Sequence, residues 1–502
     1  MAEIREPPPW AAHLPSGLAP EDVDLLRDRT LPGRWTRRWA ERPAWSQLQD
    51  VDGTWFSSDE LEELTRRAAR RLIGAGLNAG DRLIVSGVTS AELVIAYIGA
   101  LRAGLVVVPM NTAYTRAEVE RIVRDARPKG AAVDDDQRAT WIRETRPGSG
   151  VLVCGVGLEG LSDSTDADIG IDGADADDPA LLVYTSGTTG QPKGALLSHG
   201  NLLASATAVN LAWRWEPDDR LLLTLPLFHV HGLAVGLNGS LCAGAAVVLR
   251  ARFEVDDVAA RSSEVSLFFG VPTMYQRLAA TDNAQALRSL RLLVSGSAPL
   301  PAALCAEIAS AAGQLPLERY GMTETIMLTS NPYEGERKPG TVGFSLPGVG
   351  VRLGESGEVE VCGPNVIAGY YERPEANAQS FTADGWFRTG DLGEFDDEGY
   401  LTLVGRSKEL IISGGYNVYP REVEEALSTH PRVREVAVVG RPSETWGEEV
   451  TAVVVAVSPV EVEELRAHAA GQLAPYKVPR RIEFADELPR NAMGKVVRGE
   501  LG

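Results

Sequence analysis

The segment ALLVYTSGTTGQPKG, residues 180–194, decides how this sequence is interpreted. Its first part, ALLVY, is a short apolar run that predicts a buried strand. The ten residues that follow contain three glycines, four hydroxyl side chains and one lysine, Lys193. Backbone N–H groups of such a loop can converge on phosphate oxygens, and the lysine adds a positive charge. The segment therefore predicts a phosphate-binding loop at the end of a strand.

The spacing within this loop differs from that of the best-known nucleotide loops. It does not fit G-x-x-x-x-G-K-[ST], the spacing of a Walker A loop. It does not fit G-x-G-x-x-G either, which argues against dinucleotide binding. On the loop alone, an ordinary flexible connection stays an alternative, and no particular reaction is indicated.

Composition and charge exclude several classes of protein. The 502 residues carry a formal net charge of -20, which argues against binding to nucleic acids or to anionic membranes. The start of the chain lacks a cationic segment followed by an apolar one, so we expect no secretory signal. The most apolar stretch, residues 91–110, is interrupted by Arg102, glycines and a proline, which predicts a helix followed by a strand. The four cysteines show no CxxC spacing, so we expect reduced thiols and a cytoplasmic protein.

Alternation of helices and strands indicates the fold class. Residues 57–77 have helical periodicity, DRLIVSGV follows as a strand, and a helix over 91–101 precedes the strand LVVVPM. This order predicts an α/β domain with parallel sheets. Short segments with Gly and Asp turns from 357 to 406 predict a small antiparallel sheet or barrel. We therefore expect an N-terminal domain (1–406) of stacked α/β sheets with a β-barrel-like region, and a small mobile α+β domain (407–502).

Two further segments place polar side chains on short turns. ERYGMTET brings Tyr320, Thr323 and Glu324 together. A ring can stack on a base, a hydroxyl can contact a phosphate, and a carboxylate can hold Mg²⁺ that bridges phosphates. WFRTGDLG places Asp391 where a carboxylate could bind ribose hydroxyls. Taken alone, each segment is better explained by an ordinary turn or salt bridge.

Taken together, these segments resemble a known superfamily, the AMP-forming acyl-CoA synthetases and related adenylating enzymes. The resemblance rests on YTSGTTGQPKG, LPLFHVHGL, ERYGMTET, WFRTGD, VGRSKELIISGGYNVYP and LPRNAMGK, which occur in the family's order between Tyr184 and Lys495. It implies an active site between a large and a small domain. It also implies two half-reactions: a carboxylate attacks the α-phosphorus of ATP to give acyl-AMP and pyrophosphate, and coenzyme A then displaces AMP.

The resemblance also assigns roles to residues on the ATP side. Tyr320 would stack on adenine, Thr323 would contact the α-phosphate, and Asp391 and Arg406 would hold the ribose. Glu324, with Thr185, would bind Mg²⁺. The loop residues that would hold the pyrophosphate end of ATP are Thr185, Ser186, Gly187, Thr188, Thr189 and Lys193.

The resemblance gives Lys495 the central catalytic position, between the substrate carboxylate and the α-phosphate. A carboxylate is already ionised at about pH 7, so the first half-reaction needs positioning and charge neutralisation but no general base. Lys408 in GRSKEL occupies the family's hinge position. The small domain is expected to rotate about it between the half-reactions.

The identity of the acid rests on fewer residues. VPTMYQRL contains Arg277, and a buried arginine needs a partner, which a second carboxylate on the substrate would provide. A helix cap or a protein carboxylate as the partner of Arg277 is the alternative. By resemblance to malonyl-CoA synthetases, carried most specifically by TSNPYEGER, Arg277 would clamp the distal carboxylate. The other residues expected around the acid are His229, His231, Ser295 and Met322.

We therefore expect a ligase that joins malonate to coenzyme A with ATP and Mg²⁺. Leu328 stands where we expect an amide residue, which leaves malonate and methylmalonate both open. Two alternatives are a ligase for another short- or medium-chain acid and a stand-alone adenylation module that loads a carrier protein. An inactive scaffold is disfavoured by the presence of Lys193, Glu324, Asp391 and Lys495 together.

Overall fold

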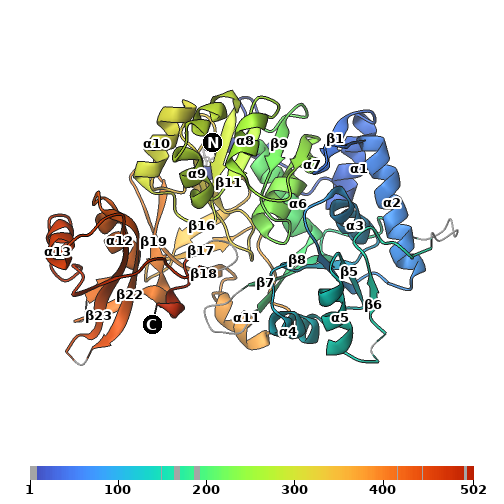
Figure 1. Ribbon diagram of the computed structural model, residues 1–502. Helices are drawn as coiled ribbons and strands as arrows, with labels where there is room; N and C mark the ends of the chain where they lie inside the picture. Colours follow the sequence, from blue (N-terminus) through green and yellow to red (C-terminus); the bar gives the residue numbers. More distant parts are fainter. Residues whose placement is uncertain are drawn as a thin grey trace, which may run out of the picture.

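The computed structural model describes residues 8–148, 150–162, 170–185, 193–414, 416–443, 445–490 and 495–501. Figure 1 shows a large body, coloured blue to orange, and a smaller orange-red body formed by the end of the chain. The predicted fold class, a large α/β domain followed by a small C-terminal domain, is confirmed. Among the described residues, no helix has both the length and the apolar character that a membrane span requires. The four cysteines are free thiols, as expected.

The first sheet carries the predicted phosphate loop. Its strand order is β6-β5-β3-β4-β7-β8, and all neighbours are parallel except β7 and β8. The helix predicted near residue 57 begins as expected, because Ser57 and Glu60 form a reciprocal capping box. The elements of this region are α2 (Ser58–Gly74), β3 (Arg82–Ser86), α3 (Ala91–Arg102), β4 (Val106–Pro109), α4 (Arg116–Ala126), β5 (Gly130–Val133), α5 (Asp136–Thr145), β6 (Leu152–Cys154), β7 (Pro179–Thr185) and β8 (Lys193–Ser198).

The second sheet has nine strands in the order β15-β14-β13-β12-β11-β9-β10-β1-β2. Its centre is parallel, and its two edges are antiparallel. The strands are β1 (Ser46–Gln49), β2 (Trp55–Ser57), β9 (Arg220–Leu223), β10 (Ala246–Leu249), β11 (Leu267–Gly270), β12 (Leu292–Ser295), β13 (Leu317–Tyr320), β14 (Thr329–Ser330) and β15 (Phe344–Ser345). The helices and helical turns around it are η1 (Pro9–His13), η2 (Pro20–Asp22), α1 (Leu31–Glu41), α6 (His199–Ala212), η3 (His231–Leu237), α7 (Asn238–Ala243), α8 (Val255–Arg261), α9 (Pro272–Ala279), η4 (Asp282–Ser289) and α10 (Ala302–Ala312).

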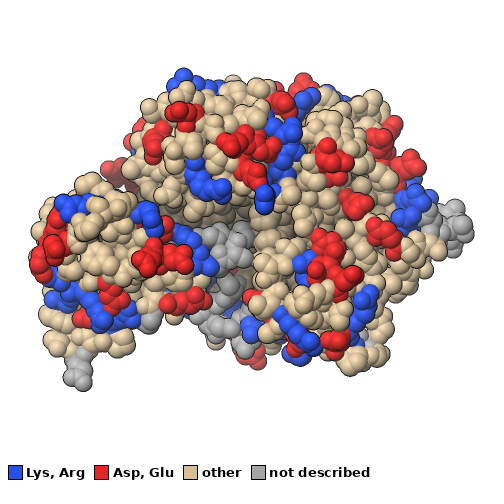
Figure 2. Space-filling model, viewed as in Figure 1, with Lys and Arg blue, Asp and Glu red and all other residues tan. Residues whose placement is uncertain are grey.

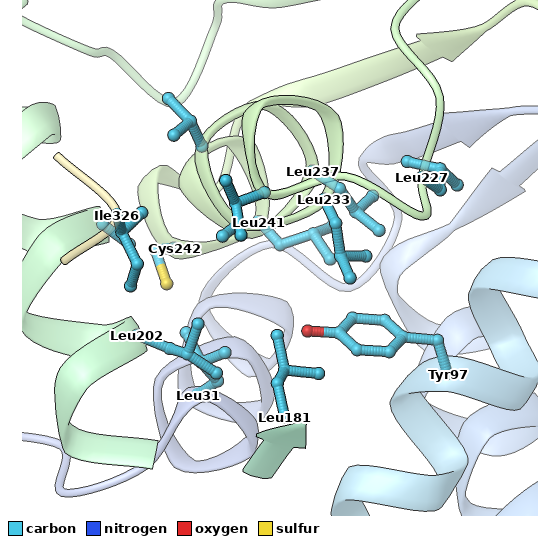
Figure 3. Close-up of a cluster of buried hydrophobic side chains, with 14 of the residues drawn as sticks. Leu31, Tyr97, Leu181, Leu202, Leu227, Leu233, Leu237, Leu241, Cys242 and Ile326 are labelled. Carbon is cyan, nitrogen blue, oxygen red and sulfur yellow. The ribbon is translucent and has the colours of Figure 1, made fainter. Parts of the chain in front are cut away.

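One continuous apolar core joins the two sheets. It contains Leu181 of the first sheet and Leu221 of the second, together with residues of α1, α3, α6 and α7. Figure 3 shows Leu202 and Leu241 in this core, with Tyr97 beside them. Each fully buried leucine stabilises the fold by about 1.5–3 kcal/mol. The two sheets are therefore held rigidly together, so the loops at their ends keep fixed relative positions.

A four-stranded antiparallel sheet follows, where the sequence predicts a small antiparallel sheet or barrel. In the described part of the C-terminal body, a five-stranded sheet packs with α12 and α13 around its own apolar cluster. The chain changes from one sheet to the other between Arg406 and Ile411, and the domain boundary at residue 407 stays a prediction. The elements are β16 (Gly350–Leu353), β17 (Glu358–Cys362), α11 (Pro374–Ser380), β18 (Phe387–Phe395), β19 (Leu401–Arg406), η5 (Ser407–Glu409), β20 (Ile411–Ser413), β21 (Tyr416–Val418), α12 (Pro420–Ser428), β22 (Val433–Ser443), β23 (Gly447–Ala456), α13 (Val462–Ala470), β24 (Arg481–Phe484) and η6 (Arg498–Glu500).

Candidate active site

The predicted phosphate loop joins two paired strands. β7 ends at Thr185 and β8 begins at Lys193, and these two residues are partners in the antiparallel ladder. The Thr185 hydroxyl donates to the Lys193 carbonyl oxygen at 3.4 Å. The two ends of the loop are thus held against each other. Four predicted loop residues, Ser186, Gly187, Thr188 and Thr189, lie outside the described residues.

Tyr370 connects the predicted phosphate lysine to the predicted metal carboxylate. Its hydroxyl donates to Glu324 Oε1 at 2.8 Å. The Lys193 ammonium lies 5.1 Å from the centroid of its ring, within the range of a cation–π contact. Burial raises the pKa of Glu324, and the hydrogen bond from Tyr370 acts in the opposite direction. One phenol therefore positions both charged groups.

The turn that carries Glu324 is unusually tight. A Cβ atom at Gly321 would lie 1.9 Å from the carbonyl oxygen of Ile326, so only glycine fits there. Ile326 itself has a φ of 58°, a left-handed conformation that is rare for a β-branched residue. Thr323 lies half-buried on the same turn, and Met322 packs against the core. Backbone strain of this kind gathers at functional sites, where the surrounding structure fixes it.

The donor set around Glu324 suits magnesium rather than a transition metal. Among the described residues, no group of three or more His, Cys, Asp and Glu side chains is arranged to hold a metal ion. Mg²⁺ is usually bound by one or two carboxylates together with substrate phosphates. Glu324, a buried carboxylate that Tyr370 connects to Lys193, fits that pattern.

The residues predicted for the nucleoside form one cluster. Arg406 Nε lies 2.9 Å from Asp391 Oδ1, and the two residues are register partners on β18 and β19. The Tyr320 hydroxyl donates to the other carboxylate oxygen of Asp391 at 2.5 Å. Tyr320 is buried, and this raises the pKa of its phenol well above the usual value. Tyr320 and Arg406 are 86 positions apart in the sequence, and the structure brings them together with Asp391.

Lys495 lies beside this cluster although it comes from the other end of the chain. Desolvation by the surrounding protein lowers the pKa of its ammonium, and Arg406 lowers it further. Asp391 and Glu409 raise the pKa, which places Lys495 within electrostatic reach of the predicted ribose site. Lys408, the predicted hinge, lies in the turn η5 between the two bodies. Figure 2 shows acidic and basic side chains interspersed over the visible face of both bodies.

Arg319 is a buried cation that the sequence analysis did not select. It lies on β13 and is 7% exposed, and its Nε and Nη2 atoms have no hydrogen-bond partner among the described residues. A Cβ atom at Gly296 would lie 2.2 Å from its guanidinium carbon, so the arginine packs directly on that glycine. Burial lowers its pKa to about 10, and the group therefore still carries a charge at pH 7. A buried guanidinium without a counter-charge is costly, so this geometry calls for an anion.

Three of the predicted acid-binding residues, Ser295, His231 and His229, lie near Arg319. Ser295 is fully buried, and its hydroxyl has no partner among the described residues. His231 is 2% exposed, its Nδ1 lies 3.2 Å from Ser297 Oγ, and its ring stacks on Phe269. Burial lowers the pKa of His231 well below its usual value, and Arg319 lowers it further. The ring is therefore neutral at pH 7, which leaves Arg319 as the positive charge of this group.

His229 lies near both Arg319 and Lys495, the predicted catalytic lysine. Its pKa is lowered to about 4, first by burial and then by the nearby charges of Arg319 and Lys495. Both cations therefore lie close to this imidazole. The Arg319 guanidinium and the predicted catalytic ammonium of Lys495 therefore both lie near one neutral ring.

The burial assumed for Arg277 is wrong. Arg277 is exposed on α9, and its guanidinium carbon lies 4.9 Å from the ring centroid of Phe253. Tyr275 and Leu278 face the core from the same helix, and this fixes the outward orientation of Arg277. An exposed arginine does not need a substrate carboxylate, so the argument from burial no longer supports Arg277. Its role toward the substrate stays a prediction.

Two residues were missed for different reasons. Arg319 lies inside ERYGMTET, next to Tyr320, and its position in a buried strand was the available signal. Tyr370 lies in GYYERPE, 46 residues after Glu324, and nothing in the sequence indicates that these two side chains meet.

Comparisons with known proteins identify the family of the chain. Residues 34–371 match the family model of the AMP-binding enzymes, and residues 422–495 match the model of their C-terminal domain. A malonate–CoA ligase of Arabidopsis thaliana is 36% identical over 477 residues, which cover 85% of this chain and 78% of the relative. A feruloyl-CoA synthase of Amycolatopsis is also 36% identical, over 93% of this chain and 98% of the relative.

A solved structure shares the same fold. The crystal structure of ATP-bound MatB from Rhodopseudomonas palustris superimposes with a TM-score of 0.88 and 37% identity, over 94% of this chain and 98% of that one. Relatives of equal identity are named for different acids, so the degree of similarity does not identify the acid. Because both family models match in order and together cover most of the chain, the chain belongs to the family of AMP-binding enzymes, and this membership supports acid–CoA ligase activity.

Proposed function

We propose that this protein ligates a small dicarboxylic acid, malonate or methylmalonate, to coenzyme A through an acyl-AMP intermediate. The observation that carries the proposal is Arg319, a buried guanidinium with unpartnered N–H groups. Its planar fork matches the two oxygens of a carboxylate. The carboxylate that does not react would bind there, while the other carboxylate faces ATP.

The first half-reaction proceeds by positioning and charge neutralisation. One carboxylate oxygen of the acid attacks the α-phosphorus of ATP, and the bond from that phosphorus to the bridging oxygen breaks to release pyrophosphate. Lys495 binds both reacting anions and offsets the charge that develops between them. Asp391 and Arg406 hold the nucleoside, and Lys193 faces the departing phosphates.

Glu324, with Thr185, would hold Mg²⁺. The ion neutralises phosphate charge when bound. Tyr370 orients the Glu324 carboxylate through its hydrogen bond of 2.8 Å. No side chain needs to remove a proton in this step, because the acid is already ionised.

The second half-reaction transfers the acyl group to sulfur. The thiolate of coenzyme A attacks the acyl carbon, the carbon–oxygen bond to AMP breaks, and AMP leaves with the electron pair. We propose that Lys495 withdraws at this stage by rotation of the C-terminal body about Lys408. The hairpin of β20 and β21 would then approach the thiol. The free cysteines fit a reducing, cytoplasmic setting.

Coenzyme A-dependent AMP formation across a panel of acids tests the proposal. The panel contains malonate, methylmalonate, succinate, acetate, butyrate, octanoate, benzoate and ferulate. We expect kcat/KM to be at least about 10-fold higher for malonate or methylmalonate than for every monocarboxylate, since one charged hydrogen-bonded pair is worth about 1.5–3 kcal/mol. A preference for ferulate, octanoate or acetate would leave the ligase chemistry in place and refute the dicarboxylate assignment. Acyl-AMP formation without transfer to coenzyme A would indicate a carrier-protein partner.

A further inference from the structure

The turn that carries Glu324 contains one strained residue, Ile326. Its φ of 58° is a conformation that β-branched residues rarely adopt, and its side chain is buried. Figure 3 shows Ile326 in the same buried cluster as Leu202 of α6. A residue keeps such a conformation only where the surrounding structure holds it in place. Neighbouring groups must therefore fix this turn.

The side-chain amide of Asn365 holds the turn on both sides of Ile326. Its Nδ2 donates to the carbonyl oxygen of Thr325 at 2.8 Å and to that of Met327 at 2.8 Å. Asn365 is 1% exposed, so water does not compete for these two carbonyl groups. One planar amide thus fixes a peptide group on each side of the left-handed residue.

A second asparagine holds the backbone around Asn365 in the same way. Asn201 Nδ2 donates to the carbonyl oxygens of Pro364 and Val366, at 2.8 and 3.0 Å. These two residues lie immediately before and after Asn365 in the chain. The position of the first amide is therefore set by the second.

Asn201 is itself tied to the strand that follows the phosphate loop. Its Oδ1 accepts from the Ser198 N–H at 2.9 Å, and its own N–H donates to Ser198 Oγ at 3.1 Å. Ser198 is the last residue of β8, which begins at Lys193. The two amides therefore connect the end of β8 to the turn that carries Glu324.

The chain after Asn365 makes two direct contacts with Glu324. The Ile367 N–H donates to the carbonyl oxygen of Glu324 at 3.0 Å. The Tyr370 hydroxyl donates to the Glu324 carboxylate at 2.8 Å. Residues 365–370 therefore hold the main chain and the carboxylate of Glu324 at the same time.

We propose that Asn365 is a positioning residue that orients the Glu324 carboxylate for Mg²⁺ and ATP, and that Asn201 supports it. The inference rests on the role proposed above for Glu324. Both asparagines donate to backbone carbonyl oxygens, so their effect on the metal ion acts through the turn. Loss of a group that orients a metal-binding side chain typically costs about 10- to 100-fold in metal affinity.

Asn365→Asp tests the proposal, and Asn331→Asp is its matched control. Aspartate has the shape of asparagine but cannot donate to two carbonyl groups at once, whether it is ionised or protonated. Asn331 is also 1% exposed, and its Nδ2 also donates to two backbone carbonyl oxygens, those of Glu318 and Thr341. The two variants therefore lose the same kind of interaction at different places.

Titration calorimetry measures the dissociation constant of ATP without acid or coenzyme A, once with Mg²⁺ and once with a chelator. We expect Mg²⁺ to tighten ATP binding about 10-fold less in Asn365→Asp than in the parent. Asn331→Asp should keep the ratio of the parent, although denaturant unfolding should show that both variants lose stability. Glu324→Gln measures the effect of losing the carboxylate itself.

Asn201→Asp provides a second variant if Asn365→Asp does not fold. It keeps an oxygen that accepts from Ser198 and removes the two N–H donations to residues 364 and 366. Asn201 is only half-buried, so we expect this variant to fold. It should show the same loss of the Mg²⁺ effect as Asn365→Asp, to a smaller degree.

Three outcomes would overturn the inference. An unchanged ratio in Asn365→Asp and Asn201→Asp, with a reduced ratio in Glu324→Gln, would overturn it and leave the role of Glu324 in place. An unchanged ratio in Glu324→Gln would overturn the proposed role of Glu324, and this inference with it. An equal loss in Asn365→Asp and Asn331→Asp would show that general destabilisation causes the effect.

Discussion

Tyr370 donates its hydroxyl to the carboxylate of Glu324 at 2.8 Å, and its ring lies 5.1 Å from the ammonium of Lys193. A cation expected to hold phosphate and a carboxylate expected to hold Mg²⁺ thus contact the same side chain. We therefore expect Tyr370 to orient both charged groups toward ATP and its metal ion.

Tyr370→Phe should lower the apparent affinity of the enzyme for Mg²⁺. The change removes the hydrogen bond to Glu324 and keeps the ring beside Lys193. Hydrogen bonds to charged groups contribute about 1.5–3 kcal/mol, so kcat/KM for ATP should fall by about 10- to 100-fold. The Mg²⁺ concentration at half-maximal rate should rise as well, as measured by initial rates over a magnesium titration.

Tyr371→Phe is the matched control for this effect. It also removes a phenolic hydroxyl, from the adjacent residue, but that hydroxyl contacts Arg127 rather than Glu324. Its magnesium dependence should equal that of the parent. Equal magnesium curves for Tyr370→Phe and Tyr371→Phe would contradict the positioning role of Tyr370.

Lys495→Ala should slow the first half-reaction much more than the second. Loss of a charge that stabilises the transition state typically costs about 10²–10³ in rate. We expect pyrophosphate exchange into ATP to fall by this factor, whereas thioester formation from supplied acyl-AMP stays within a few-fold of the parent. Arg121→Ala should change neither rate. If both half-reactions of Lys495→Ala fell equally, Lys495 would not be specific to adenylation.

Tyr320 allows its ring and its hydroxyl to be tested separately. Tyr320→Phe removes the hydrogen bond to Asp391, while Arg406 still holds that carboxylate. Tyr320→Leu removes the aromatic ring as well. Stacking of a base on an aromatic ring is worth about 1–3 kcal/mol. We therefore expect KM for ATP to rise about 10-fold more in Tyr320→Leu than in Tyr320→Phe. Equal KM values in the two variants would argue against stacking on adenine.

Glu318 should make stability depend on pH. Burial raises the pKa of its carboxyl from 4.5 to about 7. Between these values the folded state binds a proton that the unfolded state lacks, so this contribution to the free energy of unfolding falls as pH rises. From pH 5 to 8 the parent should lose up to about 3 kcal/mol more than Glu318→Gln, as measured by denaturant unfolding. A parent and variant with parallel pH dependence would show that Glu318 is ionised in the folded state.

Local sequence signals predicted most of the fold. The helix that begins at Ser58 follows from its capping box, and β7 follows from its apolar run. The ATP-side motifs also selected Glu324 and Asp391, which the structure brings into contact with Tyr370 and with Tyr320 and Arg406, respectively. Their roles toward ATP stay predictions. These features depend on neighbours in the chain, which the sequence displays directly.

Side-chain orientation and long-range contacts could not be predicted in the same way. Arg277 lies on α9, where helical phase directs Tyr275 and Leu278 inward and leaves the arginine exposed. The burial of Arg319 depends on the approach of Gly296 from the neighbouring strand, which only the tertiary structure provides. The bond from Tyr370 to Glu324 likewise joins two segments that no local pattern connects.

The most direct test of the dicarboxylate assignment is kcat/KM for malonate and for acetate in Arg319→Met, compared with Arg277→Met. Methionine keeps much of the length of the arginine side chain and removes its charge. We predict that Arg319→Met lowers kcat/KM for malonate by about 10- to 100-fold, with little change for acetate or in KM for ATP. Arg277→Met should have little effect on either acid. If Arg319→Met lowered the values for both acids equally, or if only Arg277→Met selectively impaired malonate, the account of the acid site would be contradicted.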